Sequence, residues 1–249
     1  MATESKKDAL FGGSEAWNAE DWTSSDDRVR GGKSQSYLEC SPKSPVASFY
    51  GNLDITTLGG AGFASQRTRK DENWDLSAYD GIELVITKSD GKHYTFNIKD
   101  TLLPLDPETG REQSSTSYEY DFQIAETGTV AKKSEIFIPW ESFTATYRGR
   151  VQEDAPKLNT SSIKQFSIMM RSFFGTQEGA FSLSIESISA SCSKTKDGGK
   201  EKRGAPIRDT KLFEQTSPSI LRWTMRLCFG ICGIGAMMYL FWKRSEPWK

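Results

Sequence analysis

The sequence predicts an all-β fold, an antiparallel β-sandwich or jelly roll, followed by a flexible basic linker and one C-terminal transmembrane helix. Three observations predict it. Several segments alternate between apolar and polar residues with a period of two, no long amphipathic helix lies between them, and the C-terminal part changes sharply in composition. We expect a galactose-binding-like sandwich at residues 11–191, the linker at 192–219 and the membrane anchor at 220–242.

Each alternating segment places one set of side chains on a core face and the other set toward solvent. Clusters of Gly, Pro, Asp and Ser, as at 89–91 and 105–110, separate the segments and predict turns. This pattern favours an antiparallel sandwich over a βαβ fold. The alternating apolar positions are Ile82, Leu84 and Ile86; Tyr94, Phe96 and Ile98; Tyr118, Tyr120, Phe122 and Ile124; Ile136, Ile138 and Trp140; and Phe181, Leu183 and Ile185.

The charges divide the 249 residues into an acidic body and a basic tail. Residues 193–249 contain 12 Lys and Arg against 5 Asp and Glu, a net charge of +7, which leaves -8 for residues 1–192. An acidic body argues against a nucleic-acid partner, and a basic tail suits an anionic surface. Lysines and arginines with glycines and prolines between 193 and 219 predict a flexible linker.

The anchor is predicted from residues 227–242, sixteen residues without a charge. A helix of that length spans roughly 24 Å, short of a hydrocarbon core of about 30 Å. Extending it to Ile220 includes Arg222 and Arg226, whose side chains can reach the interface. The alternative is a buried terminal helix or strand of the sandwich. We favour the membrane, because a long basic linker separates this run from a domain that already looks complete and because the run is apolar on every side. It would then be a tail anchor with the body facing the cytosol. The first ten residues resemble neither a secretory signal nor a mitochondrial presequence.

The residue types of most catalytic and metal sites are scarce. His93 is the single histidine, so a Ser-His-Asp or Cys-His triad would have to use it. The cysteines form no C-x-x-C pair, which argues against a zinc site and a disulfide framework. The adjacent acids Asp26 and Asp27 are more typical of a turn or cap than of acid–base catalysis. We therefore predict no enzyme activity, no cofactor and no metal.

Arginines form the main candidate binding set. Arg28 and Arg30 lie beside Gly31 and Gly32. The others are Arg67 and Arg69 after Phe63-Ala-Ser65, Arg148 and Arg150 on either side of Gly149, and Arg171 at the end of a predicted strand. An arginine offers a planar fork of donors suited to carboxylates, phosphates and sugar hydroxyls, although scattered arginines on an acidic domain also form structural ion pairs. The candidate partner- or ligand-binding residues are Arg28, Arg30, Arg67, Tyr94, Tyr118, Arg148 and Arg171.

Six motifs in order resemble the complex I intermediate-associated protein 30 family over about residues 11–190. They are Trp22-x-x-Ser25-Asp26-Asp27 with Gly31-Gly32-Lys-Ser34, Phe49-Tyr-Gly51, Gly62-Phe-Ala-Ser65, Asp75 to Leu84, Gly91-Lys-His-Tyr94, and Ile138-Pro-Trp140-x-x-Phe143. The resemblance implies a galactose-binding-like jelly roll without catalytic residues. We assign a motif or structural role to Asp26, Gly31, Gly32, Ser34, Gly62, Asp80, Gly81 and Trp140.

The resemblance also implies a function. Family members act as assembly factors for mitochondrial NADH:ubiquinone oxidoreductase (complex I). We therefore expect a non-enzymatic, membrane-tethered assembly factor or holding chaperone that binds a protein client, at a mitochondrial membrane or alternatively the endoplasmic reticulum. The rival hypothesis is a tethered module for a sugar or phosphorylated ligand, clamped by Arg28, Arg67 and Arg171 and stacked on an exposed Tyr94 or Tyr118.

Overall fold

The computed structural model describes residues 6–41, 44–69, 72–110, 112–127 and 133–193. The chain divides into two units, residues 1–198 and 199–249, and every described residue belongs to the first. The predicted linker beyond Ser193 and the predicted anchor lie outside the described residues. In the part described, no helix is long and apolar enough to cross a membrane.

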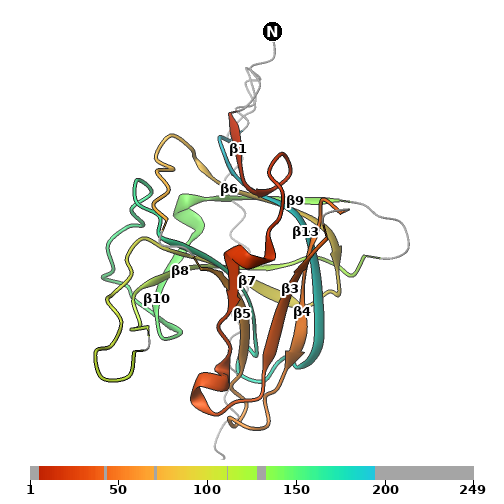
Figure 1. The fold of residues 1–249 in the computed structure, drawn as a ribbon, viewed down its shortest axis with the longest axis vertical. Coiled ribbons are helices and arrows are strands. Elements are labelled where there is room, and N and C mark those ends of the chain that lie inside the picture. The colour runs from red at the N-terminus through yellow and green to blue at the C-terminus, as the bar shows by residue number, and fades with distance from the viewer. Residues whose placement is uncertain (1–5, 42–43, 70–71, 111, 128–132, 194–249) are drawn as a thin grey trace, which may run out of the picture. The chain divides into compact units, whose positions relative to one another are not determined.

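The described strands form two antiparallel sheets packed face to face, which confirms the sandwich (Figure 1). The first sheet has the order β3-β4-β13-β6-β9, and β1 also pairs with β13. Its strands are β1 (Lys7–Gly12), β3 (Gln35–Cys40), β4 (Ala47–Leu53), β6 (Gly81–Ser89), β9 (Ser134–Pro139) and β13 (Gly179–Ser191).

The second sheet has the order β11-β10-β8-β7-β12-β5-β2. Its strands are β2 (Trp22–Ser24), β5 (Phe63–Thr68), β7 (His93–Lys99), β8 (Ser117–Gln123), β10 (Thr144–Tyr147), β11 (Arg150–Val151) and β12 (Gln165–Arg171). Short 3-10 turns, η1 (Ala19–Asp21), η2 (Asp27–Arg30) and η3 (Trp140–Ser142), connect some of them. Both β2 and β3 are edge strands of their sheets.

Period-two alternation explains the core between the sheets. Phe96 and Ile98 of β7 are fully buried and share the inner face of the second sheet with Phe166 of β12. The rings of Phe96 and Phe166 stack with their centroids 6.0 Å apart. Burying side chains of this size contributes about 1.5–3 kcal/mol each. The side chains left outside this core are therefore the ones available to a partner.

In the long strand β13, the residues that face the core change from odd-numbered to even-numbered positions at the centre of the strand. Leu183 and Ile185 face the core, and after a register shift around Glu186 the core positions become Ile188 and Ala190. A β-bulge inserts one extra residue and so moves the following side chains to the opposite face. The bulge lets one strand keep an apolar face over its whole length.

The sandwich begins earlier than the sequence predicted. We placed its start at residue 11, whereas β1 starts at Lys7 and pairs with Ser191 of β13. The alternation is weak here because β1 carries Lys7 and Asp8, both exposed, at the edge of the pairing. The second half of the strand packs on the core through Leu10 and Phe11, while its first residues are held by backbone pairing with β13.

Candidate functional site

The adjacent acids Asp26 and Asp27 are buried and bind backbone. Asp27 is fully buried, and its carboxylate accepts hydrogen bonds from the Ser34 N–H (3.0 Å), the Ser34 hydroxyl (2.6 Å) and the Phe63 N–H (3.2 Å). A carboxylate with three donors is held in one orientation. Asp27 therefore fastens η2 to the chain before β3 and to β5.

Asp26 makes a second connection of the same kind. It accepts from the Ser36 hydroxyl at 2.7 Å and from the Ser65 N–H at 3.0 Å, and Arg28 donates to it at 2.9 Å. Since Ser36 lies on β3 and Ser65 on β5, Asp26 joins the two sheets. These contacts give the acid pair a structural role, as the sequence indicated.

The motif glycines leave room for this arrangement. Gly31 has a φ of 82° and ends η2 in the left-handed region. Gly32 is not among the glycines with positive φ in the described part of the chain. A β-carbon at Gly32 would instead lie 2.2 Å from Asp27 Oδ1, and one at Gly62 would lie 2.3 Å from the Asp54 carbonyl.

The remaining motif residues hold the opposite end of the first sheet. The indole N–H of Trp140 donates to the Tyr79 carbonyl at 2.7 Å, and Asp80 accepts from the Ser193 N–H at 2.9 Å. A β-carbon at Gly81 would lie 2.2 Å from the Ile138 carbonyl. These contacts also are structural.

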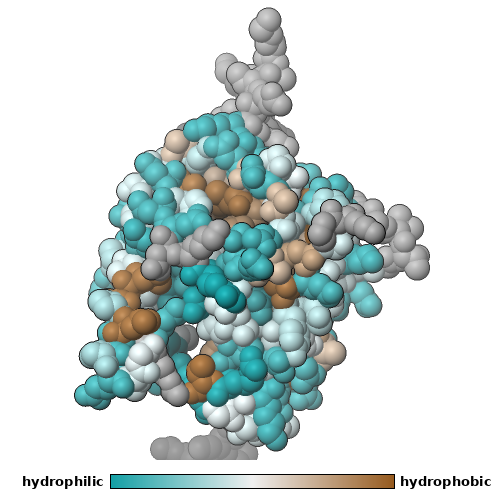
Figure 2. Space-filling model, in the orientation of Figure 1, coloured by the Kyte–Doolittle hydropathy of each residue, from teal (hydrophilic) through white to brown (hydrophobic). Residues whose placement is uncertain are grey.

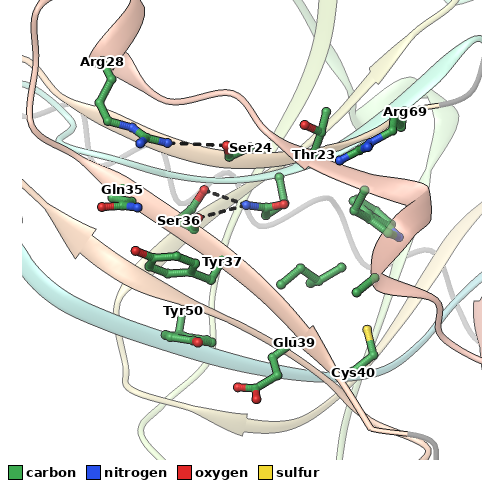
Figure 3. A pocket seen from close by; sticks show the side chains of 14 residues that line it. Thr23, Ser24, Arg28, Gln35, Ser36, Tyr37, Glu39, Cys40, Tyr50 and Arg69 are labelled. Atoms are coloured by element: carbon green, nitrogen blue, oxygen red, sulfur yellow. Dashed lines mark hydrogen bonds between the residues drawn. The ribbon is translucent and has the colours of Figure 1, made fainter.

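An open polar groove of about 520 Å³ lies between the edge strands β2 and β3 (Figure 3). One side carries Thr23 and Ser24 of β2 with Arg28 and Arg69. The opposite side carries the rest of the labelled lining, namely Gln35, Ser36, Tyr37, Glu39, Cys40 and Tyr50. This groove combines cations with exposed aromatic rings on its two sides, and we take it as the candidate site.

The aromatic side is a stacked pair. The rings of Tyr37 and Tyr50 lie 5.3 Å apart at 25°, because these residues are directly opposite each other in the β3–β4 ladder. Tyr37 is 45 % exposed and Tyr50 is 36 % exposed. Partial burial, followed by the charge of Glu39, raises the pKa of the Tyr50 phenol.

The cationic side holds two arginines with different partners. Arg28 donates to Asp26 and, at 3.5 Å, to the Ser24 hydroxyl. The Arg69 side chain has no hydrogen bond or ion pair within the described part of the chain, and it is exposed. Figure 3 shows the two guanidinium groups pointing toward each other along this side of the groove.

The other candidate arginines lie elsewhere. Arg171 forms ion pairs with Glu119 (2.7 Å) and Asp121 (2.6 Å) on the outer face of the second sheet, and Arg67 pairs there with Glu112 (2.6 Å). Arg28 lines the groove, whereas Arg67 and Arg171 do not. The predicted clamp of all three is wrong, because the structure does not bring Arg28 together with the other two arginines.

Two further candidates contact aromatic rings. The Arg30 guanidinium lies 5.7 Å from the ring centre of Phe63, and Arg148 lies 5.4 Å from that of Tyr147. Arg148 also has a φ of 52°, in a tight turn between β10 and β11. Neither arginine lines the groove.

The expectation of an exposed Tyr94 or Tyr118 is wrong. Tyr94 is fully buried with its hydroxyl on Asp90 at 2.8 Å, and burial raises its pKa. Tyr118 is 3 % exposed and donates to the Pro156 carbonyl at 2.9 Å. Both belong to the alternating sets that form the core face. Tyr118 also lines a second cavity of about 430 Å³, with Trp140, Phe143 and Leu158.

The single histidine makes no catalytic arrangement. The His93 N–H and carbonyl both bond the Gln177 side chain, and its ring contacts Phe173 edge-on at 5.6 Å. In the described ranges, no group of three His, Cys, Asp or Glu residues is placed to hold a metal ion.

Sequence reasoning missed Tyr37, Tyr50 and Glu39. Their signal was the Ser-Tyr-Leu-Glu alternation at 36–39, which identifies outward-facing residues without showing which strand lies beside them. Arg69 was noted in the arginine set but was not selected as a candidate. The cross-strand register of β3 with β4 is what brings the two tyrosines together.

The two outer-face arginines are expected to differ in their effect on stability. Arg67→Ala should lower the free energy of unfolding by less than about 1 kcal/mol, because its partner Glu112 is 48 % exposed at the side chain and can be hydrated. Arg171→Ala should cost about 2 kcal/mol, because the Glu119 side chain is only 10 % exposed. Urea unfolding of the full-length variants measures both, and an equal or reversed ranking would contradict the assignment.

Comparisons with known proteins agree with this architecture. The family model of complex I intermediate-associated protein 30 (CIA30) matches residues 9–185. An uncharacterized protein of Schizosaccharomyces pombe is 50% identical over 186 residues, which cover 73% of this chain and 82% of that protein. Among solved structures, the family 11 carbohydrate-binding module of a cellulosomal cellulase of Clostridium thermocellum is 14% identical, with a TM-score of 0.50 over 76% of this chain and 97% of the module. That likeness shows the fold alone.

Proposed function

Because the chain belongs to the complex I intermediate-associated protein 30 family, we propose that it is a non-enzymatic assembly factor that holds a protein client during assembly of a complex such as complex I. Family membership supports an assembly-related role and an association with mitochondria. The surface that we assign to the client is the groove between β2 and β3.

The observation that carries this proposal is the pairing of exposed tyrosines with arginines across one groove. Tyrosine and arginine are among the residues most often found at the energetic centres of protein interfaces. Tyr37 and Tyr50 offer rigid, partly apolar rings, and Arg28 and Arg69 offer charged donors on the opposite side. A client segment lying in the groove would contact both.

The surface composition supports a polar rather than a purely apolar contact. On the face shown in Figure 2, hydrophobic residues form separate small patches among hydrophilic ones. A chaperone that binds any unfolded chain through a broad apolar area would need a larger patch. We therefore propose selective recognition of one segment.

The buried position of Asp26 and Asp27 supports the proposal that the protein is not an enzyme. Asp26 and Asp27 both accept from backbone N–H groups and hydroxyls in the interior, which leaves neither in reach of a substrate. A general base must lie within hydrogen-bond reach of the proton it removes. Binding, rather than acid–base chemistry, fits this placement.

Membrane attachment is a further part of the proposal. Its support is the uncharged run at 227–242 and the basic residues before it. A tether of this kind would hold the groove near membrane-bound clients. Protease protection of an N-terminally tagged chain in isolated mitochondria would show which side of the membrane the domain faces.

A second candidate function is a module for a sugar or phosphorylated ligand. The observation that favours it is the same aromatic side, since Tyr37 exposes a ring face on which a sugar could stack. Pockets for small ligands usually enclose most of the ligand surface. This groove is open to solvent, so we favour binding of a protein client over binding of a small ligand.

The test of the client proposal uses the full-length chain with an affinity tag, cross-linked in cells that make complex I. Replacing Tyr37 and Tyr50 together by alanine should reduce recovery of complex I subunits about thirtyfold or more, since loss of a single central interface aromatic costs about 2 kcal/mol or more. Tyr147→Ala removes another exposed tyrosine outside the groove and should leave recovery unchanged. Equal recovery with all variants would refute the groove as the client surface.

A further inference from the structure

We infer that the groove recognises an acidic segment of the client and seats one of its carboxylates between Arg28 and Arg69. This inference rests on the proposed function and specifies the chemistry of the partner. It rests on N–H donors in the groove that have no hydrogen-bond acceptor among the described residues.

Arg28 is only partly used by its own domain. Its Nη2 donates to Asp26 and to the Ser24 hydroxyl, and its Nε and Nη1 have no acceptor in the described ranges. Its side chain is 47 % exposed, while that of Asp26 is fully buried. The buried carboxylate therefore fixes the arginine at the rim and leaves its other donors facing outward.

Arg69 is the second cation of this side, and unlike Arg28 it has no carboxylate partner among the described residues. Its backbone N–H donates to the Asp21 carbonyl at 2.8 Å, which fixes the residue just after β5. The side chain has no acceptor among the residues described, and it points along the groove toward Arg28 (Figure 3). A fork of N–H donors in this position suits the two oxygens of a carboxylate.

The charge balance favours a carboxylate over a phosphate. Arg28 and Arg69 are matched by two anions, Asp26 on Arg28 and Glu39 on the tyrosine side. The charges of these two arginines and two acids sum to zero. One carboxylate would add one negative charge to them, whereas a phosphate monoester would add close to two at pH 7. The tyrosines also provide a length of aromatic surface for the flanking residues of a peptide, which inorganic phosphate would not use.

The experiment adds short peptides to the same cross-linking reaction of the full-length chain. Capped hexaglutamate should displace the complex I subunits, whereas capped hexaglutamine at equal concentration should not. Arg69→Gln should weaken client recovery and hexaglutamate competition about tenfold, the loss of a charge-assisted hydrogen bond. Arg150→Gln, an exposed arginine on β11, is the matched control and should change neither.

The outcomes separate this inference from the proposed function. If the Tyr37 and Tyr50 double variant loses the client while Arg69→Gln keeps it, the groove binds a client but the acidic segment is refuted. Equal competition by hexaglutamine, no competition by hexaglutamate, or stronger competition by inorganic phosphate would also refute it, the last in favour of a phosphorylated ligand. If both groove variants keep the client, the groove is refuted as the client surface.

Discussion

Asp27→Ala is expected to lower the free energy of unfolding by about 3–5 kcal/mol, which makes it one of the two most damaging single changes proposed here. The carboxylate is fully buried and accepts three hydrogen bonds, from the Ser34 N–H and hydroxyl and from the Phe63 N–H. Alanine would leave the Ser34 and Phe63 N–H groups without this acceptor, at about 1–3 kcal/mol each before relaxation, whereas the Ser34 hydroxyl can still donate to the Asp54 carbonyl. Thermal and urea unfolding of the full-length protein measure the effect.

The control for this change is Glu108→Ala, which also removes an acidic side chain but from an exposed loop. Its expected effect is within about 0.5 kcal/mol, as for most surface substitutions. A loss below about 1 kcal/mol for Asp27→Ala would show that η2 is not held to β5 through this carboxylate.

Gly32→Ala is expected to lower the free energy of unfolding by about 2–4 kcal/mol. The added β-carbon would lie 2.2 Å from Asp27 Oδ1, a group that its hydrogen bonds hold in place. Overpacking a tight interior typically costs about 1–3 kcal/mol, and displacing the carboxylate adds to it. The neighbouring Gly31→Ala meets no atom within 4 Å and should cost only the strain of its positive φ, about 1 kcal/mol.

A double-mutant cycle gives the sharper form of this prediction. In an Asp27→Ala background the obstacle to the β-carbon is gone, so Gly32→Ala should cost less than about 1 kcal/mol. Urea unfolding of the four proteins provides the coupling energy. Additive effects would mean that Gly32 is required for its backbone and not for the space it leaves to Asp27.

The sequence was sufficient to predict the sandwich and most of its core. The positions Phe96, Ile98, Leu183 and Ile185 follow directly from period two and are buried as expected. The same rule, applied consistently, also places Tyr94 inside. Expecting it to be exposed contradicted the pattern that defined its strand, because side chains two residues apart share a face.

The candidate site was harder to predict. Arg28 was identified from the sequence, but its opposite side depends on Tyr37 and Tyr50, which come together only through the pairing of β3 with β4. Register between strands depends on turns and core packing that one sequence does not display. Likewise, the sequence around Arg67 and Arg171 does not show that these arginines pair with carboxylates while Arg69 keeps free donors.

The central strand β13 has a consequence for how the chain is made. It pairs with β4, β6 and β1, yet it is the last strand of the described domain to leave the ribosome. Roughly 90 residues separate the end of β6 at Ser89 from the start of β13 at Gly179, and at about 5–20 residues per second they take about 5–20 s to synthesise. During that interval β4 and β6 have emerged while the strand that joins them has not. A protein proposed to hold incompletely assembled partners therefore passes through a stage in which its own first sheet is incomplete.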